Sequence, residues 1–193
     1  MASQERAARA TDGSTVPLTI TRQELLVDGS DVKFRELVHD MLALGARHEA
    51  VRNGHASYIG LSGAQYTTLV TIRHLQDTPA TVRLIAEHLH VSPTFVTAET
   101  NKLQRSGLIT KTRSKTDSRA VNLAVTPAGH QLLAELAPAQ RRVNDEQFAE
   151  LTAEEFHELH RLVRRLVRTS DNAIARQRVI SSRATQPNVK RHP

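Results

Sequence analysis

The chain has 193 residues and a formal net charge of +6; 39% of its residues are hydrophobic, only 3% are aromatic, and it contains no cysteine or tryptophan. The absence of cysteine excludes disulfide frameworks, thiolate zinc sites and cysteine nucleophiles, and a core of leucine, valine, isoleucine and alanine favours packed helices over a large sheet. No stretch approaches the roughly 20 continuous apolar residues that cross a bilayer, and residues 1–14 are too polar for a secretion signal, so we expect a cytoplasmic protein that binds no membrane.

The positive charge is concentrated in two segments. Residues 102–119 hold six cations and one acid, and residues 172–193 hold five cations and no acid, so each segment has a net charge of +5. The rest of the chain is therefore negative, at −4. Ordinary solvated faces and a disordered tail could carry these charges, but two cationic segments also suit a polyanionic partner.

A polar arm and one long helix are predicted first. We expect residues 1–30 to form a flexible N-terminal arm. Ser30 or Asp31 can then cap a helix whose apolar residues recur at helical spacing, and Asn53-Gly54 is expected to end it.

Two shorter helices follow in the predicted order. Ser62 is a helix cap, and apolar residues at helical spacing extend that helix to about residue 75. A turn separates it from residues 82–90, whose apolar side chains lie on one helical face and whose cap is Thr81.

The next helix completes a recognisable motif. Ser92 can cap it, Pro93 fits its first turn, where no backbone N–H is needed, and Gly107 ends it after residues 94–106. Two helices of roughly ten residues joined by a turn of about three or four residues are typical of a helix-turn-helix.

The apolar period then changes from helical to alternating. Residues 108–113 and 120–125 alternate like strands, and the polar, cationic residues 114–119 separate them. This β-hairpin directly follows the helix-turn-helix, so the sequence predicts a winged helix.

Two helices are predicted after the hairpin. The first starts at Thr126-Pro127 and is expected to reach about residue 142 or beyond despite Pro138. Thr152 and Glu155 form a capping-box pattern before the second, whose wide apolar face could bury against a second subunit. Residues 176–193 form a basic tail that we expect to be flexible.

Several short motifs keep one order and spacing between residues 81 and 133. They are IAEHLHVS at 85–92, FVT at 95–97, GLI at 107–109, DSR at 117–119 and VTPAG at 125–129. In these motifs the chain resembles the MarR family of transcriptional regulators. The resemblance implies a mainly α fold: a winged helix-turn-helix at 61–129 within a domain at 31–175, with dimerisation helices at 31–60 and 130–175.

The helix at 94–106 has a polar face. Val96, Thr100 and Leu103 can face the core, and the residues spaced i, i+3, i+7 and i+11 from Thr94 share the opposite side. Its N-terminus can offer free N–H groups to phosphate, an asparagine can bond adenine with two hydrogen bonds, and Lys102 suits a backbone phosphate. The predicted DNA-binding residues here are Ser92, Pro93, Thr94, Thr97, Asn101, Lys102 and Arg105.

The hairpin tip supplies the other predicted DNA contacts, Lys115, Asp117 and Arg119. By the resemblance, Arg119 enters the minor groove, where a narrow A·T-rich sequence attracts arginine, and Asp117 steadies the wing. Asp117 could equally act only as a turn-forming carboxylate. A homodimer would bind half-sites about one helical turn apart, so the resemblance implies double-stranded DNA with an inverted-repeat operator.

Many MarR-like proteins release DNA when a small aromatic or phenolic acid binds between the dimer region and the DNA-binding part. Here Tyr66 and Arg73 share an apolar face of the second helix, and a cation on a buried face needs a partner. A ligand carboxylate could serve, as could Asp40 or Glu36, or the cation could simply be exposed. The candidate ligand-binding residues are Tyr66, Arg73, His39 and His48.

Other classes of function have less support. The chain has no Gly-rich phosphate loop, no GxSxG and no HExxH, so we expect no enzyme and no cofactor. His157 and His160 are spaced for chelation, but no acidic or sulfur ligand accompanies them, so we expect no metal. The alternative is a non-specific architectural nucleic-acid-binding protein without an effector, although such proteins usually stack bases on exposed aromatic rings.

Overall fold

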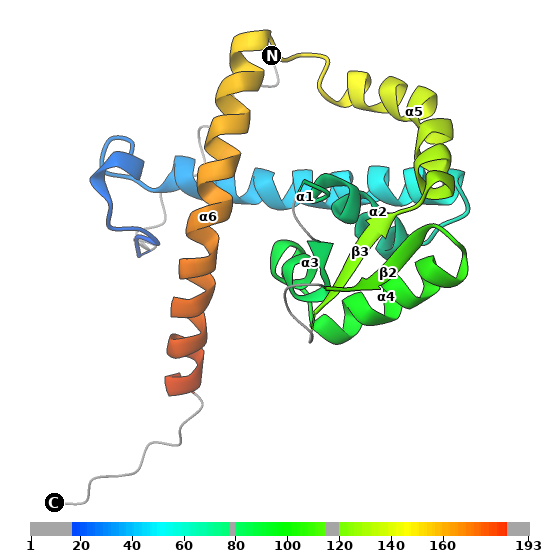
Figure 1. Cartoon of the computed structure of the whole chain (residues 1–193). Coiled ribbons are helices and arrows are strands. Elements are labelled where there is room, and N and C mark those ends of the chain that lie inside the picture. Colours follow the sequence, from blue (N-terminus) through cyan, green and yellow to red (C-terminus); the bar gives the residue numbers. More distant parts are fainter. Residues whose placement is uncertain (1–16, 78–79, 115–119, 185–193) are drawn as a thin grey trace, which may run out of the picture. The chain divides into compact units, whose positions relative to one another are not determined.

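Helices form most of the chain. The computed structural model describes residues 17–77, 80–114 and 120–184, and the chain divides into two compact units, Met1–Ala139 and Gln140–Pro193 (Figure 1). The long elements are α1 (Val32–Tyr58), α2 (Gly63–His74), α3 (Val82–Leu89), α4 (Pro93–Arg105), α5 (Pro127–Gln147) and α6 (Ala153–Ala184), and a 3-10 turn at Gln23–Leu25 precedes them. No described helix is both long and apolar enough to span a membrane.

A small antiparallel sheet combines one strand before the helix-turn-helix of α3 and α4 with two strands after it. Its strands are β1 (Ala80–Thr81), β2 (Ile109–Arg113) and β3 (Val121–Val125), in the order β1-β3-β2. The hairpin of β2 and β3 confirms the predicted wing. The sequence did not predict β1, because a strand of two residues is too short to show an alternating pattern.

The predicted caps of α2 and α3 are confirmed, whereas at α1 the N-cap residue Asp31 makes no side-chain cap bond and accepts from Thr19 instead. Ser62 accepts from the Gln65 N–H, and the Gln65 side chain accepts from the Ser62 N–H in return, which makes a full capping box at α2. Thr81 accepts from the Leu84 N–H at α3. Each cap satisfies a backbone N–H that has no partner within its helix.

The predicted end of α1 is wrong. The helix runs through Asn53-Gly54 and ends at Tyr58, before Gly60 at a φ of 70°. His55 and Ala56, in the last turn, are buried, and α1 packs against α2. This tertiary burial outweighs the roughly 1 kcal/mol by which glycine disfavours a helix.

The core of the first unit contains buried residues from its helices and from both strands of the hairpin. Leu69 and Ile72 of α2, Ile85 of α3, and Val96 and Leu103 of α4 are completely buried. They pack in one cluster with Ile109 of β2, Leu123 of β3 and Leu136 of α5. The sheet, the helix-turn-helix and the start of α5 therefore form one packed body.

The second unit holds the whole of α6. Thr152 and Glu155 form both bonds of the predicted capping box. The helix continues past residue 175, the predicted end of the dimerisation helices, as far as Ala184, so part of the segment expected to be a flexible tail is helical. Short polar residues and arginines after residue 168 carry too weak an apolar pattern to show this extension.

One prediction concerns Gly129, in the first turn of α5. A Cβ at this position would lie 2.4 Å from the Leu108 carbonyl oxygen and 2.7 Å from Val125 Cγ1. Gly129→Ala is therefore expected to destabilise the chain by about 1–3 kcal/mol, because backbone would have to move. The matched control is Gly54→Ala, since a Cβ there meets nothing within 4 Å. Urea unfolding should show a loss for the first variant only; equal stabilities would contradict the close approach.

A second prediction concerns Asp31, a buried carboxylate at the start of α1. The Thr19 hydroxyl and N–H both donate to its Oδ2, at 2.6 and 2.7 Å, and Arg35 lies 3.2 Å from Oδ1. These contacts, the Thr19 hydroxyl first, hold the pKa of Asp31 below its ordinary value.

A lowered pKa in the folded state stabilises the fold above the unfolded pKa of aspartate, about 3.9, and this contribution disappears as the pH falls through the lower folded value. Asp31→Asn should therefore have a lower Tm than the parent at neutral pH. The difference should shrink below about pH 4. Thermal unfolding across this range is the measurement, and a Tm gap independent of pH would show that the ionised carboxylate contributes nothing.

Candidate nucleic-acid interface

Helix α4 presents one polar side and one apolar side. Val96, Thr100 and Leu103 are completely buried, as predicted. The exposed residues on the opposite side include Thr94, Thr97, Asn101 and Arg105. The packing of α4 thus separates a core-facing edge from a polar face that is available to a ligand.

The N-terminus of α4 is also exposed. Ser92 caps it by accepting from the Phe95 N–H at 3.1 Å, and Pro93 occupies the first helical position. A three-residue turn separates α4 from α3, and His90 in that turn adopts a left-handed φ of 55°. The free N–H groups of this terminus carry a partial positive charge that favours an anion such as phosphate.

A buried acid on α4 escaped the sequence analysis. Glu99 is only 5% exposed, and its Oε1 accepts from Lys102 Nζ at 2.7 Å. Its Oε2 is buried and has no hydrogen-bond partner among the residues that the structure describes. Any move of Lys102 towards a phosphate would therefore leave a buried carboxylate without its cation, which carries a large cost. Glu99 lies three residues after the buried Val96, and this helical spacing was the available signal.

A second contact joins α4 to the wing. Lys111 of β2 donates to Asn101 Oδ1 at 2.6 Å, and partial burial lowers the pKa of Lys111. Lys111 thereby uses one of the two lone pairs of the Asn101 oxygen, so a bidentate bond to adenine would share this oxygen with Lys111, and the amide N–H groups can still donate to phosphate or to guanine. Because side chains alternate along a strand, Lys111 lies on the same face of β2 as the buried Ile109. This alternation could have predicted the contact between Lys111 and α4.

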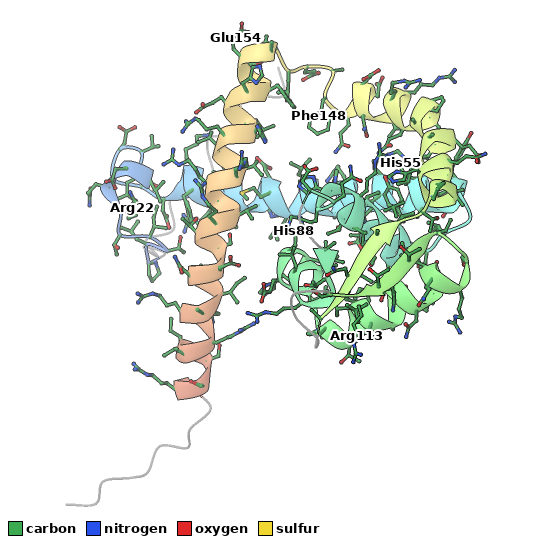
Figure 2. All side chains as sticks on the ribbon, in the orientation of Figure 1. Arg22, His55, His88, Arg113, Phe148 and Glu154 are labelled. Atoms are coloured by element: carbon green, nitrogen blue, oxygen red, sulfur yellow. The ribbon has the colours of Figure 1, made fainter. Side chains whose placement is uncertain are left out.

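The predicted wing contacts lie beyond the part of the hairpin that the structure describes. Lys115, Asp117 and Arg119 lie outside the described residues. The strands that lead to them are well defined: Arg113 is opposite Val121, and the Ser114 N–H donates to the Ala120 carbonyl at 3.0 Å. Arg113, labelled in Figure 2, is an exposed cation at the last position of β2.

The predicted ligand residues do not form one site. Arg73 is exposed, which agrees with the last of the three alternatives, and among the described residues no ion pair joins it to Asp40 or Glu36. Tyr66 is buried, with its ring 6.2 Å from that of His55. His39 and His48 are exposed and nine residues apart on α1, which places them on opposite sides of the helix.

Two of the grooves on the first unit are lined by described residues near the predicted site. The smaller, of about 520 Å³, includes His39 beside Asp40, Glu36, Arg35 and Val32. The larger, of about 570 Å³, is lined by Glu49, Arg52, Asn53, Gly63, Ala64, Thr67, Leu89, Val91 and Phe95. Neither groove contains Tyr66, Arg73 or His48.

The larger groove combines one cation with an apolar wall. The Arg52 guanidinium donates to the Thr67 hydroxyl at 2.6 Å and lies 3.0 Å from Glu49. Leu89, Val91 and Phe95 supply apolar surface from the end of α3, the turn that follows it and the first turn of α4. Sequence reasoning missed Arg52 because it placed the end of α1 at that point.

The described residues offer no group of three or more side chains that could hold a metal ion. His157 and His160 instead lie beside Phe156, with ring centroids 5.7 and 6.4 Å from its ring. This arrangement is ordinary surface packing on a helix.

Residues 59–120, which run from the end of α1 to the wing, match the sequence model of the MarR family. This segment is a MarR-family winged helix. The match covers the helix-turn-helix and β2 but ends before β3, and it confirms the predicted family for this segment. The chain therefore carries the DNA-binding fold of MarR-family transcription regulators.

Solved structures extend the likeness beyond this segment. The transcriptional regulator BldR from Sulfolobus solfataricus is similar with a TM-score of 0.59 and 21% identity, over 75% of this chain and 99% of that one. A mutant of MarR from E. coli, complexed with operator DNA, has a TM-score of 0.56 and 20% identity, over 70% of this chain and 94% of that one.

The MepR–DNA complex from S. aureus has a TM-score of 0.53 and 18% identity, over 77% of this chain and 99% of that one. At such identities the likeness concerns the fold. No curated protein matches the chain.

Proposed function

We propose that the protein is a transcriptional repressor that binds an inverted-repeat DNA operator as a homodimer, through α4 and the wing. The observation that carries the proposal is the polar face of α4: four residues that can bond phosphate or bases are exposed on the side opposite its buried edge. In a winged helix this helix is the one that enters the major groove. MarR and MepR, with the same fold, were each solved with DNA.

Exposed apolar residues on two helices support a homodimer. On α1, Leu37, Val38, Met41, Leu42 and Leu44 are each more than 40% exposed in the single chain. On α6, Phe156, Leu162, Val163, Leu166 and Val167 are similarly exposed. Apolar surface of this extent marks an interaction site. A second copy supplies the same stripes in return, and two winged helices related by a dyad account for an inverted repeat.

We further propose that a small aromatic carboxylate releases the operator by binding in the larger groove. The Arg52 guanidinium could hold the carboxylate, and the apolar wall could take the ring. Because Phe95 lies in the first turn of α4, an occupant of the groove would act directly on the helix that we expect to read DNA.

The first test replaces Asn101 on the polar face of α4. Asn101→Ala is expected to weaken operator binding by about 1–3 kcal/mol, because one base or phosphate contact is lost. Arg119→Ala in the wing should cost a similar amount. The control is Asn144→Ala, the same change at an exposed position of α5.

Binding is measured by gel shift and footprinting on the upstream region of the protein's own gene. A discrete protected palindrome that weakens only in the Asn101 and Arg119 variants supports the repressor. Uniform protection of any DNA, unaffected by both changes, would favour the architectural alternative.

The second test uses salicylate and benzoate as probes of the groove. Both are expected to raise the Tm of the protein and to weaken operator binding, since each stabilises the conformation that it occupies. Arg52→Met should abolish both effects, while Arg47→Met, on the same helix but outside the groove, should keep them. The same response in the Arg52 variant would remove the groove from the proposal.

A further inference from the structure

The arginines of α6 form a surface that takes no part in the operator binding proposed for α4 and the wing. Between residues 161 and 183 the helix contains seven arginines and a single acid, Asp171. All seven arginines are exposed. They are Arg161, Arg164, Arg165, Arg168, Arg176, Arg178 and Arg183.

These arginines lie opposite the apolar stripe in the first half of the helix, although the exposed Val179 projects from the same side as they do. At about 100° per residue, the apolar residues from Phe156 to Val167 form one stripe, and every arginine except Arg178 projects from the opposite half of the helix. We call these six residues the arginine face. The side chains of α6 stand clear of the ribbon in Figure 2.

The arginine face is largely free of internal acidic partners. In the described chain, only Arg161 of the seven arginines forms an ion pair, with Glu158. The hydrogen bond that Arg161 donates to Glu158, together with the charges of Arg161 and Arg165, lowers the pKa of Glu158. The remaining charge is not balanced within the helix, so the face attracts a polyanion.

We propose that the arginine face of α6 binds the phosphate backbone of duplex DNA, as a second contact separate from α4 and the wing. The cations are all arginine, whose planar guanidinium matches the oxygens of a phosphate with two parallel hydrogen bonds. From Arg161 to Arg183 the helix rises about 33 Å, close to the roughly 34–36 Å of one DNA turn.

An anionic membrane surface is the other partner that fits a basic amphipathic helix. The composition of the chain supports a membrane less well than it supports DNA. Interfacial helices insert their apolar face into lipid and are often anchored by tryptophan. The chain has no tryptophan, both of its tyrosines lie outside α6, and the apolar stripe of α6 is the surface that we assign to a second copy. The arginine face is therefore free to contact DNA while the dimer is intact.

The test removes three adjacent charges from the face in the full-length protein. The variant is Arg164→Gln/Arg165→Gln/Arg168→Gln, and the matched control, Arg22→Gln/Lys33→Gln/Arg47→Gln, removes the same charge from exposed positions elsewhere. Binding to a long duplex with the operator at its centre is measured over a range of salt concentrations. Each phosphate contact contributes about 0.9 to the slope of log K against log salt.

The face variant is expected to show a smaller slope and at least about tenfold weaker binding at low salt than the control. Equal slopes and affinities for parent, control and face variant would overturn the inference. Sedimentation confirms the oligomeric state of each protein. Should the triple variant lose its partner, Arg176→Gln/Arg183→Gln, beyond the dense part of the apolar stripe, provides the same comparison.

Two further readouts separate the alternatives. Flotation with vesicles of phosphatidylserine and phosphatidylcholine tests for membrane binding. If vesicle binding requires the arginine face while the salt dependence of DNA binding is the same in the parent and the face variant, the inference is overturned in favour of lipid.

Footprinting separates this inference from the proposed repressor. Uniform protection with a slope that depends on the face would refute the repressor and leave the second contact standing.

Discussion

The burial of one edge of α4 determines which side chains of the winged helix face solvent. Val96, Thr100 and Leu103 are completely excluded from solvent, and α4 packs against α2, α3 and β2. Because side chains on a helix repeat every 3.6 residues, anchoring this edge fixes the direction of the opposite one. Asn101 then points away from the core, and its contact with Lys111 joins the exposed edge of the helix to the wing.

The same helix contains a buried group that is only partly satisfied. Glu99 occupies the buried side, and within the described part of the chain one of its oxygens is unpaired, a desolvation cost that a leucine would avoid. Its partner, Lys102, extends towards solvent at the margin of the polar face. Lys102 neutralises a buried acid and also lies beside the face that we propose contacts DNA. The same charge therefore contributes both to the stability of α4 and to the positive potential of its surface.

Charge is distributed along this chain in a way that follows its two units. The first unit carries cations on β2 and on the exposed side of α4, the helix whose capped N-terminus offers free N–H groups. The second unit concentrates arginine along α6, after an N-terminal turn of that helix that is acidic, as the helix dipole favours. Each unit therefore has its own cationic surface, and the apolar stripe of α6 remains a separate feature of the second one.

The sequence by itself determined the local structure: the caps at Ser62, Thr81 and Ser92, the hairpin, and which edge of α4 is buried. These follow from neighbouring residues, whose spacing and turn chemistry are visible in one dimension. Tertiary structure decided the rest. The continuation of α1 through Asn53-Gly54 depends on burial against α2, and the exposure of Arg73 depends on which neighbours cover the last turn of α2. No pattern of spacing records such contacts, because the partner comes from another part of the chain.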